Sequence, residues 1–199
     1  MKSETASEVL RELGPVFRSS QAVASGVSWR DLYALRDSGA LIELSRGVFQ
    51  LADVGFDRVD YVAVSARVPD GMICLDSALE YWDLTDQIPP VVHVAVPSGA
   101  HRPTIDHPPT RVHVFKAESF VLGRQEVVGE AGDRFWITDR ERTVVDVFRL
   151  RHLVGSDVAL EALATYWRRR GRDVPRLVEL AGTLGGWTAM YEAIQVLQA

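Results

Sequence analysis

Three aspartates in the last third of the chain have the type and spacing best suited to metal-assisted chemistry. They are Asp133, Asp139 and Asp146. Carboxylates of this kind hold Mg²⁺ in enzymes that transfer phosphoryl groups. Such enzymes also surround the phosphates with a glycine-rich loop, and residues 129–132, Gly-Glu-Ala-Gly, are too few to match either the P-loop or the kinase pattern. We therefore favour a binding protein without chemistry of its own, and keep a phosphotransferase as the alternative.

Histidine and cysteine are the other side chains that could ligate a metal or attack a substrate. Four of the five histidines fall within residues 93–113, namely His93, His101, His107 and His113. Their spacings fit no established ligand pattern, and no cysteine is near. We expect a pair of strands with half-exposed histidines, no metal site and no cofactor. The single Cys74 lies in an apolar run and is expected to be a buried, unreactive thiol.

The first sixty residues contain the order of elements typical of a winged helix-turn-helix. We predict helices over residues 6–13, 19–24 and 29–38, with Ser19 or Ser20 capping the second and Ser28 capping the third. A turn at Gly26 separates the last two helices. Strands over residues 41–44 and 48–51 follow, joined at a hairpin tip over residues 45–47. The hairpin would be the wing.

In a winged helix the third helix enters the major groove of DNA and the wing contacts the backbone. The residues expected to face DNA are Ser19, Ser20, Ser28, Trp29, Arg30, Tyr33, Arg36 and Arg46. Leu32 and Leu35 would pack inward. Residues 1–58 carry seven Lys/Arg against eight Asp/Glu, a net charge of −1. This weak basic character leaves open a winged helix that contacts protein instead.

The remaining residues indicate a mixed α/β domain. We predict helices over residues 56–68 and 76–82, the second capped by Asp76 or Ser77, and strands over residues 72–75, 91–96 and 111–115. A capping box of Thr138 and Glu141 would begin a helix that runs to residue 150. Further helices are expected over residues 157–170, from Asp173 onward and over residues 188–197. In the first of these, Leu160, Leu163, Ala164 and Trp167 would face inward.

Composition is that of an ordinary globular protein, with 47% hydrophobic residues and a net charge of −5 over 199 residues. No apolar run reaches the roughly 20 residues that a membrane span needs, and the first residues lack a signal-peptide pattern. We expect a cytoplasmic protein with an α/β (α+β) fold in two domains, a winged helix-turn-helix at residues 1–56 and a mixed α/β domain at residues 57–199.

Two segments of the α/β domain resemble a known family. One is Ile73-Cys74-Leu75-Asp76-Ser77-Ala78-Leu79, and the other runs from Thr138 through Arg142-Thr143-Val144-Val145-Asp146. Behind a winged helix, this order is similar to that of AbiEi-type antitoxins of type IV toxin–antitoxin systems. The resemblance implies a cytoplasmic antitoxin that represses its own operon by binding operator DNA, with a homodimer on DNA as one arrangement. It also implies that the second domain neutralises a nucleotidyltransferase-like toxin.

The toxin contact would involve charged residues late in the chain. The candidates, whether they make or support the contact, are Arg140, Arg142, Asp146, Arg168, Arg169, Arg170 and Arg172. Asp146 is expected to form a salt bridge with Arg142 or Arg149, and the Arg168–Arg172 cluster would also be favoured at a helix C-terminus without any partner. Two alternatives stay open: a phosphotransferase that inactivates the toxin covalently, and a stand-alone winged-helix regulator, for instance one that responds to a small molecule.

Overall fold

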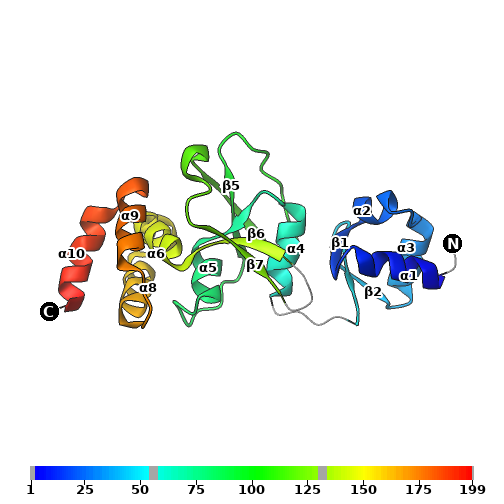
Figure 1. Cartoon of the computed structure of the whole chain (residues 1–199), viewed down its shortest axis with the longest axis horizontal. Helices are drawn as coiled ribbons and strands as arrows, with labels where there is room; N and C mark the ends of the chain where they lie inside the picture. The colour runs from blue at the N-terminus through cyan, green and yellow to red at the C-terminus, as the bar shows by residue number, and fades with distance from the viewer. Residues whose placement is uncertain (1–2, 54–57, 130–133, 199) are drawn as a thin grey trace.

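The computed structural model describes residues 3–53, 58–129 and 134–198. Figure 1 shows an elongated molecule, with a small helix-and-strand unit at the N-terminal end, a sheet in the middle and a group of helices at the C-terminal end. The fold is mixed α/β, as the sequence predicted. None of the helices in the described ranges is long and apolar enough to cross a membrane.

The N-terminal unit is a winged helix. Its elements are α1 (Ser3–Glu12), β1 (Val16–Arg18), α2 (Ser19–Ala24), α3 (Trp29–Asp37), β2 (Leu41–Ser45) and β3 (Val48–Leu51). The strands form an antiparallel sheet in the order β1-β3-β2. Ser28 caps α3 by accepting a hydrogen bond from the Asp31 amide, as predicted. Leu32 and Leu35 are buried in the core of the unit with Phe17 and Phe49, which confirms the inward face of α3.

Two predictions for this unit were wrong. Strand β1 was not expected, because three residues show no periodicity and gain their hydrogen bonds only by pairing with β3. The N-cap of α2 is Arg18 instead of Ser19 or Ser20, since the strand continues to Arg18 and the Gln21 side chain accepts a hydrogen bond from its amide.

The central sheet has five strands in the order β6-β5-β4-β8-β7. They are β4 (Met72–Ile73), β5 (Val92–Pro97), β6 (Thr110–Phe115), β7 (Arg124–Val128) and β8 (Arg134–Thr138). The pairs β5–β6 and β4–β8 are parallel and the other two are antiparallel. Helix α4 (Val59–Arg67) covers one face, where Val62 and Val64 pack against Val94 and Ile137. Strands β7 and β8 were not predicted.

The remaining helices form a second layer. They are α5 (Leu75–Tyr81), the short 3-10 helix η1 (Ala117–Ser119), α6 (Arg140–Arg149), α7 (Arg151–Val154), α8 (Ser156–Arg168), α9 (Val174–Leu184) and α10 (Trp187–Gln198). In this layer α5 and α6 contact the sheet, and the later helices pack against α6 and one another. Their apolar faces, with Val144, Phe148 and Tyr166 among them, form the largest core. Asp173 caps α9 as predicted, by accepting from the Arg176 amide.

Several local predictions in this region were wrong. The strand at residue 72 ends at Ile73, and Cys74 is the N-cap of α5 in place of Asp76 or Ser77. The capping box of Thr138 with Glu141 does not form. Thr138 ends β8, and Asp139 caps α6 by accepting from the Arg142 amide at 2.6 Å. Leu160, expected to face inward, is 49% exposed, because Ala159, Ala162, Leu163 and Tyr166 form the buried face of α8.

Candidate functional site

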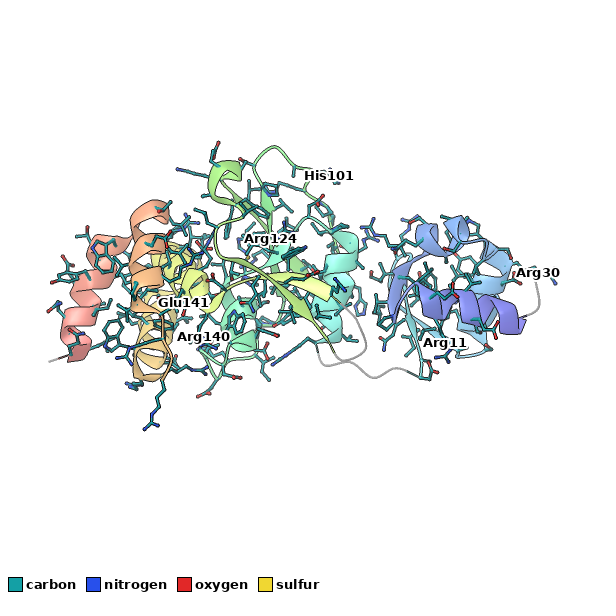
Figure 2. The ribbon with its side chains drawn as sticks, viewed as in Figure 1. Arg11, Arg30, His101, Arg124, Arg140 and Glu141 are labelled. Carbon is teal, nitrogen blue, oxygen red and sulfur yellow. The ribbon has the colours of Figure 1, made fainter. Side chains whose placement is uncertain are left out.

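The leading turn of α3 presents an aromatic and basic surface. Trp29 is 49% exposed and Tyr33 is 39% exposed, and their rings stack with centroids 5.9 Å apart. Arg30 is also exposed, and Figure 2 shows it at the end of the molecule that lies away from the central sheet. The Ser28 hydroxyl that caps the helix also contacts the Asp31 carboxylate, which lies 2.8 Å away. The leading turn is therefore well fixed and open to a large partner.

Arg36, one turn further along α3, is held by acidic neighbours. Its guanidinium lies 2.8 Å from the Asp37 carboxylate and 3.3 Å from that of Glu43, and it lies over the Tyr33 ring at 4.6 Å. The hydrogen bond to Asp37 raises the pKa of Arg36 further. Two carboxylates thus offset the positive charge of Arg36, so its contribution to a DNA surface is smaller than the sequence suggested.

The wing tip is held by residues on both sides of it. The Ser19 amide donates to the Gly47 carbonyl at 2.9 Å, which joins the start of α2 to the wing. Arg67, in the last turn of α4, donates from Nη1 to the Arg46 carbonyl at 2.6 Å. The Arg46 side chain is exposed, and so is that of Ser20. The structure therefore places the predicted wing residues on one fixed, accessible element.

A second candidate surface pairs arginines with tryptophans on the α/β domain. Arg140, at the start of α6, lies over the Trp82 ring at 5.6 Å, and Arg172 lies over the Trp167 ring at 5.4 Å. Arg169 donates to the Asp83 carbonyl, next to Trp82, so the two stacked pairs share one region. We call this region the Arg–Trp surface. Its members are Arg140, Arg168, Arg169, Arg170, Arg172, Trp82 and Trp167, and Figure 2 labels Arg140 within it.

The Arg–Trp surface has capacity for further hydrogen bonds. Arg168, Arg170 and Arg172 are exposed. Stacked guanidinium groups keep their N–H donors in the plane of the group, where a carboxylate or phosphate can bind. This arrangement is suited to an acidic partner.

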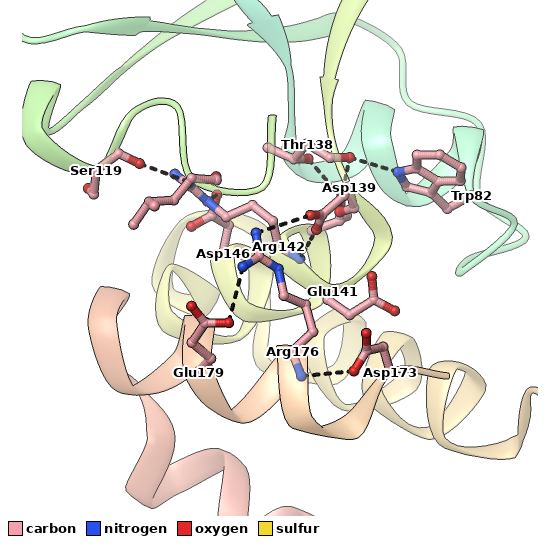
Figure 3. Close-up of polar contacts among 12 residues, drawn as sticks. Trp82, Ser119, Thr138, Asp139, Glu141, Arg142, Asp146, Asp173, Arg176 and Glu179 are labelled. Atoms are coloured by element: carbon pink, nitrogen blue, oxygen red, sulfur yellow. Dashed lines mark hydrogen bonds and ion pairs between the residues drawn. The ribbon is translucent and has the colours of Figure 1, made fainter. Parts of the chain in front are cut away.

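Arg142 and Asp146 cannot contact a partner directly, so of the two roles expected for them only support of the contact is compatible with their positions. Both side chains are fully buried, with Arg142 Nε 2.6 Å from one Asp146 carboxylate oxygen and Arg149 Nε 2.9 Å from the other. Arg142 Nη1 also donates to the carbonyls of Ser119 and Leu122. Figure 3 shows Arg142 at the centre of these contacts. The predicted salt bridge of Asp146 is confirmed, and its role is to hold α6 in place.

The residues considered for metal or phosphoryl chemistry do not come together. Asp139 caps α6 and Asp146 is engaged by two arginines, while Asp133 lies outside the described residues. Within the described ranges, no group of three or more His, Cys, Asp or Glu is placed to hold a metal ion. Cys74 is buried, and burial raises the pKa of its thiol well above the usual value.

Two of the histidines form a pair on the sheet, in which His93 is buried and His113 is partly buried. His113 Nε2 lies 3.3 Å from His93 Nδ1, and His93 Nε2 lies 3.6 Å from the Asp76 carboxylate. His93 is only 5% exposed, so its predicted half-exposed position was wrong. Burial and the neighbouring His113 lower the pKa of His93 to about 4, so it is neutral at pH 7. The pair therefore packs as neutral rings.

Sequence reasoning missed the aromatic members of the Arg–Trp surface and the link between α4 and the wing. Trp82 and Arg140 are far apart in the chain and meet only because the Trp82 indole donates to the Thr138 carbonyl at 2.8 Å. Arg67 reaches the wing because α4 packs against the winged-helix strands. No local pattern in the sequence signals either contact.

The chain is similar to a known protein family and to solved structures. Residues 4–52 match the family described as "Transcriptional regulator, AbiEi antitoxin". No curated protein matches the chain. The crystal structure of the RV2827C protein from Mycobacterium tuberculosis is similar, with a TM-score of 0.62 and 13% identity, over 97% of this chain and 75% of that one. At this identity the likeness concerns the fold alone. The family match covers the winged helix, so residues 4–52 of the chain are similar to the AbiEi antitoxin family of transcriptional regulators, in agreement with the resemblance seen in the sequence.

Proposed function

We propose that the chain is the antitoxin of a type IV toxin–antitoxin system. Its winged helix, within residues 1–56, binds operator DNA and represses its own operon, as a homodimer on a two-fold site. Its α/β domain, within residues 57–199, neutralises a nucleotidyltransferase-like toxin in the cytoplasm. The observation that carries this proposal is the family match of residues 4–52, which coincides with the winged helix.

The surface of α3 supports the DNA-binding half of the proposal. Trp29, Arg30 and Tyr33 are exposed on its leading turn, where a winged helix contacts base edges. Of the two arginines on this helix, Arg30 is expected to contribute more to DNA binding, because Arg36 is paired with Asp37 and Glu43. Ser19, Ser20, Ser28 and Arg46 complete the proposed DNA surface.

The Arg–Trp surface supports the antitoxin half. It is accessible, it carries several positive charges and it includes two large aromatic rings, a composition enriched in the energetic centres of protein interfaces. Arg142 and Asp146 support this surface from beneath by holding α6, which carries Arg140. We expect the toxin to present carboxylates to it.

Co-expression tests the proposal most directly. The full chain is expressed with the toxin candidate encoded beside it, growth is measured, and the toxin is purified and its intact mass determined. Rescue of growth with an unmodified, co-purifying toxin supports neutralisation by binding. Rescue with a toxin of increased mass supports the phosphotransferase alternative instead. Neither rescue nor association contradicts the antitoxin assignment and leaves a stand-alone regulator.

A charge variant of the Arg–Trp surface sharpens this experiment. Arg140→Glu is expected to abolish rescue, because it places a carboxylate against the acidic toxin surface. Arg111→Glu, with the same charge change at an exposed position on β6, is the matched control and is expected to rescue normally. Equal rescue by both variants would exclude the Arg–Trp surface as the contact.

A further inference from the structure

Arginines from both domains gather at the wing tip. Arg46 is at the tip itself, Arg18 ends β1 beside it, and Arg67 comes from the last turn of α4. Strand β1 pairs with β3 so that Arg18 lies opposite Val48, directly after the tip. Arg18 donates from Nε to the Ala66 carbonyl, and Arg67 donates from Nη1 to the Arg46 carbonyl. We call these three residues the wing-tip arginines.

Each of the two bonded arginines keeps donors for another ligand. A guanidinium group has five N–H donors. Arg18 uses Nε and Arg67 uses Nη1 for the contacts across the junction. These contacts fix the direction of both side chains, so less conformational entropy is lost when a ligand binds to the remaining donors.

A cleft between the winged helix and α4 is lined by Arg18, one of the wing-tip arginines, and by Arg134 of β8. Its volume is about 590 Å³, and its walls include Arg18, Ser20, Ser65 and Ala66. No aspartate or glutamate is among its lining residues in the described part of the chain. The protein as a whole has a net charge of −5, so the cleft differs in charge from the rest of the molecule. A wall without carboxylates favours the binding of an anion.

The winged helix by itself has little positive charge that is not offset by carboxylates. Residues 1–58 have a net charge of −1, and Arg36 is paired with two carboxylates. Binding to the DNA backbone depends on the number of phosphates that cations neutralise. A cation supplied by α4 next to the wing would therefore add to the interface where the winged helix is weakest.

We propose that Arg67 and Arg18 bind a DNA backbone phosphate beside the wing, so that the DNA interface extends from the winged helix across the domain junction onto α4. This inference rests on the proposed DNA-binding function. Arg67 has two roles in it: its Nη1 positions the wing through the Arg46 carbonyl, and its remaining donors contact the phosphate.

The test is a salt titration of DNA binding by the full chain. Two duplexes are used, one from the region upstream of the chain's own coding sequence and one of the same composition in shuffled order. Arg67→Ala is expected to weaken binding to both duplexes about five- to tenfold and to reduce the slope of log K against log salt by about one. Arg67→Lys retains the charge and is expected to retain the slope.

Arg111→Ala is the control, because Arg111 is also a cation of the α/β domain, is exposed on β6 and belongs to neither proposed interface. It is expected to bind DNA like the native chain. An unchanged slope with Arg67→Ala would overturn the phosphate contact, even if affinity fell through loss of wing positioning. Native binding with Arg67→Ala would overturn the inference alone, whereas absence of DNA binding by the native chain would overturn the DNA-binding proposal with it. Thermal unfolding of each variant verifies that it is folded.

Discussion

Removing the charge of Asp146 is expected to destabilise the α/β domain severely. In Asp146→Asn, the side chain keeps its size but Arg142 and Arg149 lose the carboxylate that both contact. Arg142 is fully buried, so water cannot replace the lost partner. Breaking a buried ion pair by removing one member costs about 3–5 kcal/mol. Because domains are stable by about 5–15 kcal/mol, this change is between about a fifth and the whole of the total.

The assay is urea unfolding of the full chain, followed by tryptophan fluorescence. Trp29 is the one tryptophan of the winged helix, and the other four are in the α/β domain. In a Trp29→Phe background the signal therefore reports the α/β domain. Glu179→Gln is the matched control, because Glu179 contacts Arg176 at 3.1 Å but is 66% exposed. It is expected to change the free energy of unfolding by less than about 1 kcal/mol.

A double variant separates the cost of the unpaired charge from the cost of lost packing. Arg142→Met with Asp146→Leu removes both charges and is expected to recover much of the stability that Asp146→Leu alone loses. Recovery should stop short of the native value, since the carbonyls of Ser119 and Leu122 lose the donor that Arg142 provides. A loss below about 1 kcal/mol in Asp146→Asn, no larger than in the control, would refute the buried-pair argument.

Three further predictions follow from the buried groups and the helix cap. The pKa of His93 is about 4 in the folded chain and near 6.5 in the unfolded chain. Between these pH values the unfolded chain therefore binds more protons. The free energy of unfolding should fall by about 2 kcal/mol as the pH drops from 7.5 to 5. Urea midpoints at both pH values check this, and an equal fall in His93→Gln would contradict it. Ser28→Ala should cost the winged helix about 1 kcal/mol, because the Asp31 amide loses its acceptor, and Trp29 fluorescence in urea measures it; an unchanged midpoint would show that the cap is dispensable. Cys74 should resist a thiol reagent such as dithionitrobenzoate until urea unfolds the chain, and fast labelling of the native protein would disprove its burial.

The winged helix could be predicted from sequence because its signals are local. Ser28 caps α3 within one turn, and Leu32 and Leu35 recur at helical spacing. The strands of the wing flank a short turn, so they pair with each other along the chain. Strand β1 was not predicted because its three residues are extended only through pairing with β3, which lies some thirty residues later in the chain. Strands β7 and β8 were missed because their five residues each, Arg-Gln-Glu-Val-Val and Arg-Phe-Trp-Ile-Thr, show no alternation of polar and apolar residues.

The Arg–Trp surface could be predicted only in part, because sequence does not show which arginine of a helix faces the core. Arg140 and Arg142 are two positions apart, which places them on different sides of α6. Arg142 points into the core toward Asp146, and Arg140 lies over Trp82 at the surface. The residue at which α6 begins determines which of the two arginines faces the core. The Asp139 amide donates to the Gly123 carbonyl, and this contact turns the chain at the start of the helix. Gly123 is required at this point, since a Cβ would lie 2.6 Å from that of Arg142.

The two proposed interfaces are connected by a short path through the central sheet. Strand β8 presents Phe135 and Ile137 to α4, and its last residue, Thr138, leads directly into the cap of α6. Helix α4 in turn holds the wing through Arg67. The same strand therefore supports the helix that carries Arg140 and the helix that positions the wing.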